Sequence, residues 1–339
     1  MKTLLSQALK FENNALLVLD QTQLPHDEVW LDCQSPDEMV AIIKRLSVRG
    51  APLIGVAAAL ALAHYVEQGA TTEEIEIAAA KLVAARPTAV NLSYCIHAQM
   101  KAYRQMRDQQ VIVDMAEFLF EEDARLSQSI SEQGAALIQA GESILTHCNT
   151  GGLVTTGIGT ALGVIIRAHQ QGKNIHVFVD ETRPLLQGAR LTTWELLRAG
   201  VPHTLICDNM AACLMRDKKI HRVITGADRI AANGDTANKI GTYGVAALAY
   251  MHGIPFHIAA PKTTIDLTCL TGQEIEIEQR KSSEVRGYTN TQWAPQESPV
   301  FNPSFDVTPK KFITNFITEG GVIANVNEFR TLYDLSELT

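Results

Sequence analysis

A cysteine followed by glycines is the first feature of this sequence that could carry chemistry. The stretch HCNTGGLVTTGIGTALGVI runs from His147 to Ile165 and combines the end of a strand pattern, a glycine-rich turn and a helical pattern. Exposed N–H groups of the turn and the N-terminus of the following helix would favour a thiolate at Cys148, whereas a buried structural thiol is the alternative for any single cysteine. Adjacent strand residues point to opposite faces, so we expect His147 to pack in the core rather than to pair with Cys148.

A second polar segment, GADRIAANGDTANK, follows another apolar run and contains Asp228. An aspartate at a strand end caps a turn about as often as it takes part in catalysis. Asn238 and Lys239 stand close behind it, and their amide and ammonium groups could bind hydroxyl or phosphate oxygens. We therefore regard Asp228 as a candidate acid–base group and Asp235 as a turn or cap residue.

Two arginines stand at helix boundaries, where they could bind an anion. Arg49 precedes Gly50-Ala51-Pro52, which begins a helical pattern, and a helix N-terminus beside an arginine is suited to phosphate. A helix C-terminal cation is the alternative for Arg49. Arg86 begins the turn RPTAVNL, where a surface salt bridge is an equal alternative, and Gln187 in QGAR carries little weight by itself.

The elements that must position these residues change character along the chain. Helical patterns dominate the first part, over residues 36–46, 52–67, 72–85, 92–107 and 115–140, after a strand pattern at 15–20. Ser35 and Glu38 form a capping-box pattern at the first of these helices. After Gly141, the short apolar runs SILTHC, IHVFVD, HTLICD, HRVITG and PFHIAA alternate with helical patterns, which predicts a parallel sheet covered by helices. The last pattern, TPKKFITNFITEGG, predicts one more helix capped by Thr308.

The expected fold is therefore α/β, with a Rossmann-like parallel-sheet domain at residues 126–339 after a smaller, mostly helical α+β domain at residues 1–125. We place the boundary within residues 107–141, where the hydrophobic period changes. Polar loops follow four of the five predicted strands, and ligands of open α/β sheets bind at the carboxyl ends of the strands. The sequence thus predicts a ligand site on that rim.

Composition excludes several classes of protein. The 339 residues are 46% apolar and 19% charged, with a formal net charge of −8 and no run of lysine or arginine, so a nucleic-acid surface is not expected. No apolar stretch is long enough to span a bilayer, and the N-terminus shows no signal-peptide pattern. The six cysteines are scattered, with no spacing typical of a metal site, which favours a cytoplasmic protein with free thiols.

A nicotinamide-dependent dehydrogenase is one alternative. Gly157, Gly159 and Gly163 form G-x-G-x-x-x-G, one residue away from the dinucleotide fingerprint, and Asp180 ends the next predicted strand, where such enzymes bind the ribose. The glycines begin several residues beyond the predicted strand end, however, which leaves CNTGG as the tight turn.

Taken together, the motifs resemble a known family. LDQTQLP, RGAPLIG, RPTAVNL, THCNTGG, ETRPLLQGARLTTWEL, GADRIAANGDTANKIGTY, AAPKTTID and NPSFDVTP occur in this order over nearly the whole chain. They are similar to the S-methyl-5-thioribose-1-phosphate isomerases, which belong to a larger family with the alpha, beta and delta subunits of translation initiation factor 2B. Gly152 stands where the family more often has alanine, and Gln279 where glutamate is usual.

The resemblance implies an aldose–ketose isomerase of a phosphosugar, without metal or cofactor, acting as a homodimer. It assigns catalysis to Cys148 and Asp228. The substrate contacts that it implies are Arg49, Gly50, Ala51, Arg86, Gln187, Asn238 and Lys239. The same chemistry on 5-deoxyribose 1-phosphate stays open, as does a non-catalytic regulatory subunit like those of initiation factor 2B.

Overall fold

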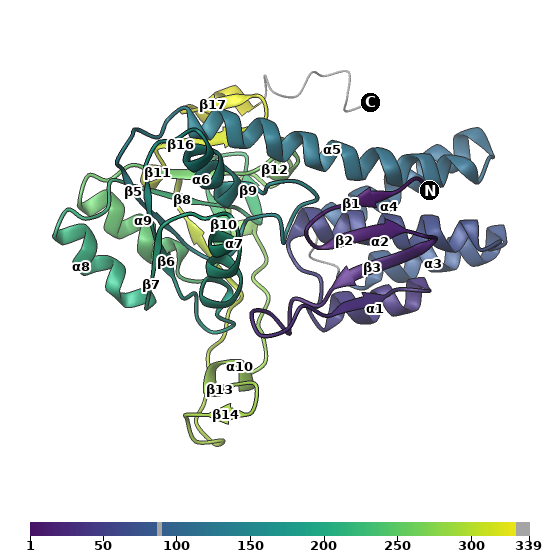
Figure 1. The fold of residues 1–339 in the computed structure, drawn as a ribbon, viewed down its shortest axis with the longest axis horizontal. Coiled ribbons are helices and arrows are strands. Elements are labelled where there is room, and N and C mark those ends of the chain that lie inside the picture. Colours follow the sequence, from purple (N-terminus) through teal and green to yellow (C-terminus); the bar gives the residue numbers. More distant parts are fainter. Residues whose placement is uncertain (87–89, 330–339) are drawn as a thin grey trace. The chain divides into compact units, whose positions relative to one another are not determined.

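The computed structural model describes residues 1–86 and 90–329 (Figure 1). The chain forms two compact units. The first contains Met1–Gln128 and Thr150–Gly159, and the second contains Ser129–Asn149 and the chain from Thr160 onward. The domain boundary between residues 125 and 126 stays a prediction. Nothing in the sequence predicts that residues 150–159, which follow the first strand of the second unit, pack in the first unit.

A small antiparallel sheet opens the first unit. Its strands pair in the order β1-β2-β3-β4 and are β1 (Leu4–Leu5), β2 (Leu9–Glu12), β3 (Ala15–Leu19) and β4 (Trp30–Asp32). Leu9 and Phe11 of β2 are buried, while Lys10 and Glu12 between and after them are half-buried. This alternation is what a sheet with one covered face requires.

Five helices follow, and one of them lies almost entirely in the core. They are α1 (Pro36–Lys44), α2 (Ala51–Glu67), α3 (Thr72–Ala84), α4 (Val90–Met106) and α5 (Gln110–Ala135). Helix α2 is apolar on all sides and buried from Leu53 to His64, as expected of a central core helix. A Cβ on Gly55 would lie 2.7 Å from the backbone oxygen of Asn91, so this glycine lets α2 and α4 pack closely.

The cap of α1 differs in one detail from the capping-box prediction. Ser35 Oγ accepts the backbone N–H of Glu38, as predicted. The Glu38 carboxylate accepts the N–H of Gln34 rather than that of Ser35.

The second unit contains the predicted parallel sheet. Its seven strands pair in the order β17-β16-β11-β8-β5-β6-β7, and only β17 is antiparallel to its neighbour. The strands are β5 (Ser143–Thr146), β6 (His176–Asp180), β7 (His203–Ile206), β8 (Arg222–Thr225), β11 (Phe256–Ala259), β16 (Asn315–Thr318) and β17 (Gly321–Ile323). The six parallel strands follow the Rossmann order, with the chain reversing direction across the sheet between β5 and β8. The fold class predicted from the sequence is confirmed.

Helices, a smaller sheet and an arm complete the second unit. The helices are α6 (Ala161–Gln170), α7 (Thr193–Arg198), α8 (Ala211–Arg216) and α9 (Thr242–Met251). The smaller sheet has the order β12-β9-β10-β15, from β12 (Ile265–Asp266), β9 (Arg229–Ala231), β10 (Thr236–Lys239) and β15 (Phe305–Thr308). Helix α10 (Ser283–Arg286) and strands β13 (Gly287–Tyr288) and β14 (Thr291–Gln292) form an arm that projects from this unit in Figure 1.

The helix predicted over TPKKFITNFITEGG is wrong. Thr308 ends strand β15, only a 3₁₀ turn forms at Lys310–Phe312, and the rest of the stretch makes β16 and enters β17. Phe316 and Ile317 are buried in the sheet beside β11. Pairing with β11 and burial in the core outweigh the helical spacing of the apolar residues.

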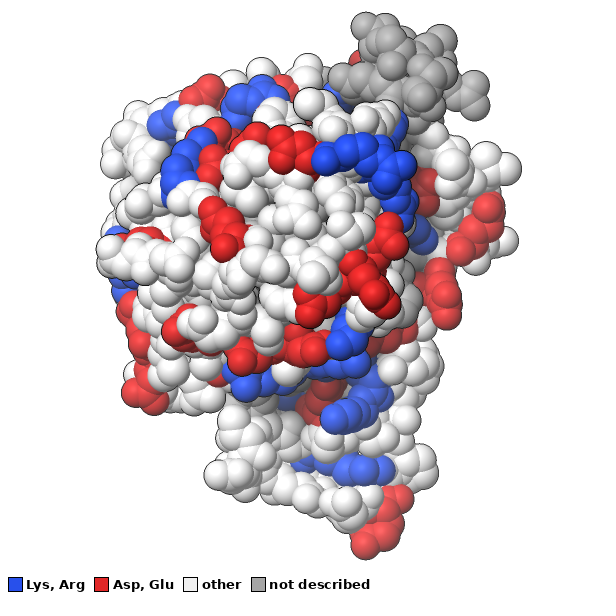
Figure 2. Space-filling view, turned by 90° about the vertical axis from the view of Figure 1, so that its right-hand side faces the viewer, with Lys and Arg blue, Asp and Glu red and all other residues white. Residues whose placement is uncertain are grey.

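None of the described helices combines the length and apolar character needed to cross a membrane. On the face drawn in Figure 2, basic and acidic side chains are interspersed around an uncharged central area. On that face, neither basic nor acidic side chains form a large patch.

A buried charge cluster at the amino ends of the central strands predicts a pH-dependent stability. Arg222 binds the Glu142 carboxylate through two hydrogen bonds and donates a third to Nε2 of His257. Burial, together with the Arg222 charge, lowers the pKa of His257 from 6.5 to about 4. Below pH 6.5 the unfolded chain therefore binds a proton at His257 that the folded chain excludes. The part of the folding stability that depends on neutral His257 is fully present above pH 6.5 and is lost as the pH falls toward 4.

We expect the free energy of unfolding to fall by about 2 kcal/mol more between pH 7.5 and pH 5 in the wild type than in His257→Gln. Glutamine keeps an acceptor for Arg222 but does not titrate. Urea unfolding at the two pH values measures the difference, and equal losses in both proteins would show that His257 is not the responsible group.

Candidate functional site

The cysteine and the aspartate singled out in the sequence follow β5 and β8, the two neighbouring strands between which the strand order changes direction. Cys148 comes two residues after β5, and Asp228 comes three residues after β8. The two strands are neighbours, and Thr146 Oγ1 donates to the Ile224 carbonyl between them at 2.9 Å. Such a switch point at the carboxyl ends of the strands is where open α/β sheets bind ligands.

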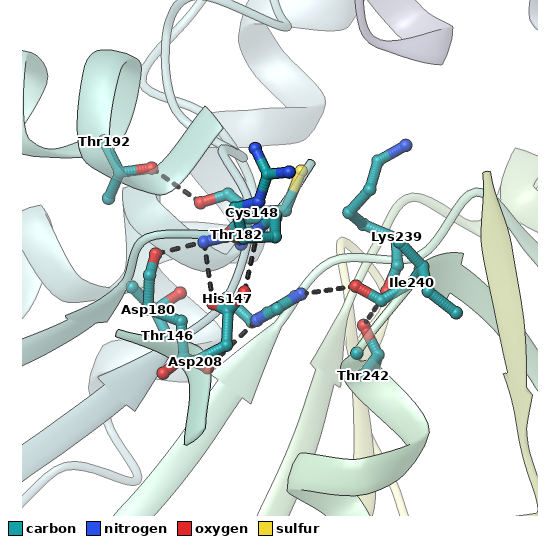
Figure 3. Close-up of polar contacts among 12 residues, drawn as sticks. Thr146, His147, Cys148, Asp180, Thr182, Thr192, Asp208, Lys239, Ile240 and Thr242 are labelled. Atoms are coloured by element: carbon teal, nitrogen blue, oxygen red, sulfur yellow. Dashed lines mark hydrogen bonds and ion pairs between the residues drawn. The ribbon is translucent and has the colours of Figure 1, made fainter. Parts of the chain in front are cut away.

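The Cys148 turn is fixed by side chains from the neighbouring loops. Cys148 is buried and adopts a left-handed backbone with φ of 66°, a conformation that a residue with a Cβ adopts only when its surroundings enforce it. Its N–H donates to Thr182 Oγ1 at 2.8 Å, and its carbonyl accepts from Thr192 Oγ1 at 2.6 Å. In Figure 3 the sulfur of Cys148 and the ammonium end of Lys239 extend to the same side.

His147 is buried, as predicted, but it does more than pack in the core. Its Nδ1 lies 2.9 Å from Asp180 Oδ2 and its Nε2 lies 2.9 Å from the Ile240 carbonyl oxygen, as Figure 3 shows. Both ring nitrogens are thus bound to other groups, so His147 does not form a dyad with Cys148. Burial lowers the pKa of His147, but the hydrogen bond and charge of Asp180 outweigh it and leave the pKa raised.

Asn238 and Lys239 are the last residues of β10, and a short turn joins them to α9. Asn238 Nδ2 donates to Thr242 Oγ1, whose hydroxyl donates to the Lys239 carbonyl. The Lys239 ammonium donates to the Ser304 carbonyl at 3.0 Å and lies 4.7 Å from the ring centre of Phe305. Both predicted binding residues are therefore held in defined positions.

Gln187 offers a buried acceptor. It is 4% exposed, and within the described structure its Oε1 has no hydrogen-bond partner. A π-helical turn, Gly188–Thr192, follows it directly, and such turns are frequent at functional sites. A Cβ on Gly188 would lie 1.7 Å from the Asp180 carbonyl oxygen, so only glycine allows this turn to lie against the end of β6.

Asp228 is half-buried, and its N–H donates to the Ala237 carbonyl, which ties it to β10. Asp235 is the cap that the sequence predicts, because its carboxylate accepts the N–H groups of Lys310 and Gly272. The two aspartates of this segment thus differ in their surroundings.

The other four predicted residues lie in the first unit. Gly50, with φ of 86°, is the N-cap of α2, and Ala51 is the first residue of that helix. A Cβ on Gly50 would lie 2.3 Å from Cβ of Val154. Arg49 and Arg86 are both half-buried, and the three residues after Arg86 lie outside the described part of the chain.

One group of described residues has the composition of a metal site. Ligand atoms of His147, Asp180 and Asp208 lie within 4.8 Å of one another. However, Asp208 accepts the N–H groups of Thr182 and Arg183 through its two oxygens, and both nitrogens of His147 are used as described above. These residues fit the role of holding the loops after β5 and β6 better than that of binding a cation.

The geometry does not fit the dinucleotide interpretation. Asp180 is fully buried against His147, where it could not reach a ribose. Gly157 and Gly159 belong to the segment that packs in the first unit, and Gly163 lies inside α6. Residues 147–160, between β5 and α6, therefore do not form the tight strand-to-helix turn that the fingerprint requires.

Thr182, Thr192 and the His147–Asp180 pair were not identified from the sequence. The ETRP residues that follow β6 form a polar loop, but nothing in the sequence indicates that Thr182 accepts the N–H of Cys148. These contacts arise between segments far apart in the chain.

Comparison with known proteins agrees with this geometry. The model of the initiation factor 2 subunit family matches residues 47–325. The chain belongs to this family. A methylthioribose-1-phosphate isomerase of Serratia proteamaculans is 52% identical over 327 residues, which covers 95% of this chain and 96% of that protein.

Two solved structures are similar over almost the whole chain. The crystal structure of a 5-methylthioribose 1-phosphate isomerase from Pyrococcus horikoshii has a TM-score of 0.90 at 39% identity, covering 99% of this chain and 97% of that one. A second structure, described as translation initiation factor eIF-2B, subunit delta, from A. fulgidus, has a TM-score of 0.85 at 38% identity, covering 96% of this chain and 100% of that one. Both the isomerase resemblance and the wider family are thus confirmed.

Proposed function

We propose that this chain is an aldose–ketose isomerase that converts S-methyl-5-thio-α-D-ribose 1-phosphate to S-methyl-5-thio-D-ribulose 1-phosphate in methionine salvage. The observation that carries the proposal is the 52% identity, over 95% of the chain, to a protein named for this reaction. The position of Cys148 and Asp228 at the switch point of the sheet supports it.

The substrate dictates an unusual first step. Ordinary aldoses open through a free anomeric hydroxyl, but the phosphate ester at C1 blocks that route. The ring C–O bond must break with the phosphate in place, so the ring oxygen needs a proton. Asp228 is the proposed acid that supplies it.

Hydrogen must then move from C2 to C1, and two routes do so. A Cys148 thiolate can remove the C2 proton to give a phosphoenolate that is protonated at C1, or a hydride can shift directly beside Cys148. Turnover in deuterated water tests the first route, because deuterium at C1 of the product supports proton transfer through an exchanging base, whereas its absence leaves hydride transfer open. Oxidation at C2 and reduction at C1 balance within one molecule, so the proposed reaction needs no nicotinamide.

The proposed substrate contacts supply both anion binding and hydrogen bonds. Arg49, Gly50 and Ala51 stand at the N-terminus of a long helix, a position suited to a phosphate, and Arg86 adds a second guanidinium. In the second unit, Lys239 and Asn238 are donors. Gln187 Oε1, buried without a partner in the described structure, is suited to accept from a sugar hydroxyl.

Two further properties belong to the proposal. We expect the enzyme to act in the cytoplasm as a homodimer, because the family resemblance implies a dimer and the scattered cysteines suit a reducing compartment. Gly152 and Gln279 depart from the family pattern without being among the proposed catalytic or binding residues.

The test is NMR of the purified chain with methylthioribose 1-phosphate and, separately, with 5-deoxyribose 1-phosphate. We expect the anomeric proton signal to disappear and a ketone carbon to appear, faster with the thio sugar. A preference for the deoxy sugar would keep the chemistry and change the substrate. No conversion of either sugar by folded protein would overturn the proposal and favour a regulatory role like that of the eIF-2B subunits, which a 38% identical structure is named for.

A further inference from the structure

We propose that His147 is a positioning residue that fixes the turn after Lys239, at residues 240 and 241, relative to the turn that contains Cys148. The inference rests on the proposed function for its catalytic consequence. His147 adjoins Cys148 in the chain, and its side chain binds the carbonyl of Ile240, which adjoins Lys239. One side chain therefore connects a proposed catalytic residue to a proposed binding residue, within a single unit of the structure.

The donor in this connection is determined by its partner. A carbonyl oxygen only accepts hydrogen bonds, so Nε2 of His147 must carry a proton. Asp180 Oδ2 faces the other nitrogen, and both side chains are essentially inaccessible to solvent. Asp180 thus fixes the orientation of the ring, in the way that a carboxylate orients an active-site histidine.

The turn is shaped to receive the ring. Gly241, with φ of 105°, lies so close that a Cβ there would be 2.8 Å from Cε1 and 2.9 Å from Nε2 of His147. Any other residue at 241 would separate the turn from the imidazole.

Asp306 also holds this turn. Its two carboxylate oxygens accept the N–H groups of Gly241 and Tyr243, at 2.7 and 3.0 Å. With the Ile240 carbonyl bound by His147, the turn is fixed through an acceptor at residue 240 and donors at residues 241 and 243. Loss of the acceptor contact would let Lys239 move, and a displacement of about 1 Å costs roughly 10²-fold in rate.

Two amide variants provide a matched test. In His147→Gln the terminal amide reaches the position of Nε2 and can donate to Ile240, whereas in His147→Asn it reaches only the position of Nδ1. We expect His147→Asn to lower kcat/KM by roughly 10²-fold and His147→Gln to keep activity within about fivefold of the wild type. His147→Leu is a second variant without a donor, in case the asparagine variant does not fold.

A double-mutant cycle with Lys239→Ala separates positioning from general stability. If His147 acts through Lys239, the variant without a donor costs less than about threefold once Lys239 is absent. The proposal is overturned if the losses of kcat/KM from the His147 and Lys239 substitutions simply multiply in the double variant. It is also overturned if His147→Asn and His147→Gln lose kcat/KM equally. Failure of both donor-less variants to fold also overturns it, because His147 would then serve the fold itself.

Hydrogen exchange of the ligand-free chain gives a readout independent of turnover. We expect amides of residues 238–243 to exchange about tenfold faster in His147→Asn, the effect of losing roughly one net hydrogen bond, and at the wild-type rate in His147→Gln. Unchanged exchange in both variants would overturn the proposal. A wild-type chain that converts neither sugar, yet shows this exchange pattern, would overturn the proposed function alone.

Discussion

Cys148→Ser is expected to lower kcat for methylthioribose 1-phosphate by about 10²- to 10⁴-fold, the range for loss of a positioned acid–base group. A serine hydroxyl fits the same space but is far less acidic than a thiol, so it provides almost no base at neutral pH. The Thr182 and Thr192 contacts involve only the backbone of residue 148, so the turn is expected to keep its geometry. Steady-state kinetics and a thermal melting curve measure the two effects separately.

Cys207→Ser is the matched control. Cys207 is an exposed thiol at the end of β7, and the charge of Glu181 raises its pKa, which makes it a poor nucleophile. We expect its replacement to leave kcat unchanged. Retention of activity within about threefold in Cys148→Ser would show that the thiol is not the base and would favour the hydride route.

The architecture of the second unit was largely predictable because parallel strands carry a strong signal. Runs such as RVIT in β8 are buried at every residue, and glycines such as Gly200 and Gly253 follow the ends of the helices between the strands. The stretch after Thr308 was not predictable in this way. Its phenylalanines and isoleucines also suit a helical spacing, and only the presence of β11 as a neighbour makes β16 the better solution.

The sequence identified candidate site residues but not the contacts that hold them. Strand-end position indicated Cys148 and Asp228, whereas the family resemblance was needed for Arg86 and Gln187. The prediction for His147 used strand alternation, which places its side chain away from that of Cys148 but cannot show what it meets. Its partners, Asp180 and the Ile240 carbonyl, come from segments 33 and 93 residues away.

Asp228→Asn is expected to lower kcat by about 10²- to 10⁴-fold with little change in KM. Asparagine has almost the shape of aspartate and can still form a hydrogen bond to the ring oxygen, but it cannot transfer a proton as a carboxylic acid does. The bound substrate would therefore keep its position while ring opening slows. Initial rates over a range of substrate concentrations separate the effect on kcat from that on KM.

Asp235→Asn tests whether this loss is specific to the proposed acid. Asp235 lies in the same polar segment, but its carboxylate caps a turn by accepting from Lys310 and Gly272. Its replacement is expected to reduce the free energy of unfolding by about 1 kcal/mol and to leave kcat unchanged. If Asp228→Asn keeps full activity while Asp235→Asn loses it, the two assignments are reversed. If both keep full activity, another group must protonate the ring oxygen, because the blocked anomeric carbon still requires an acid.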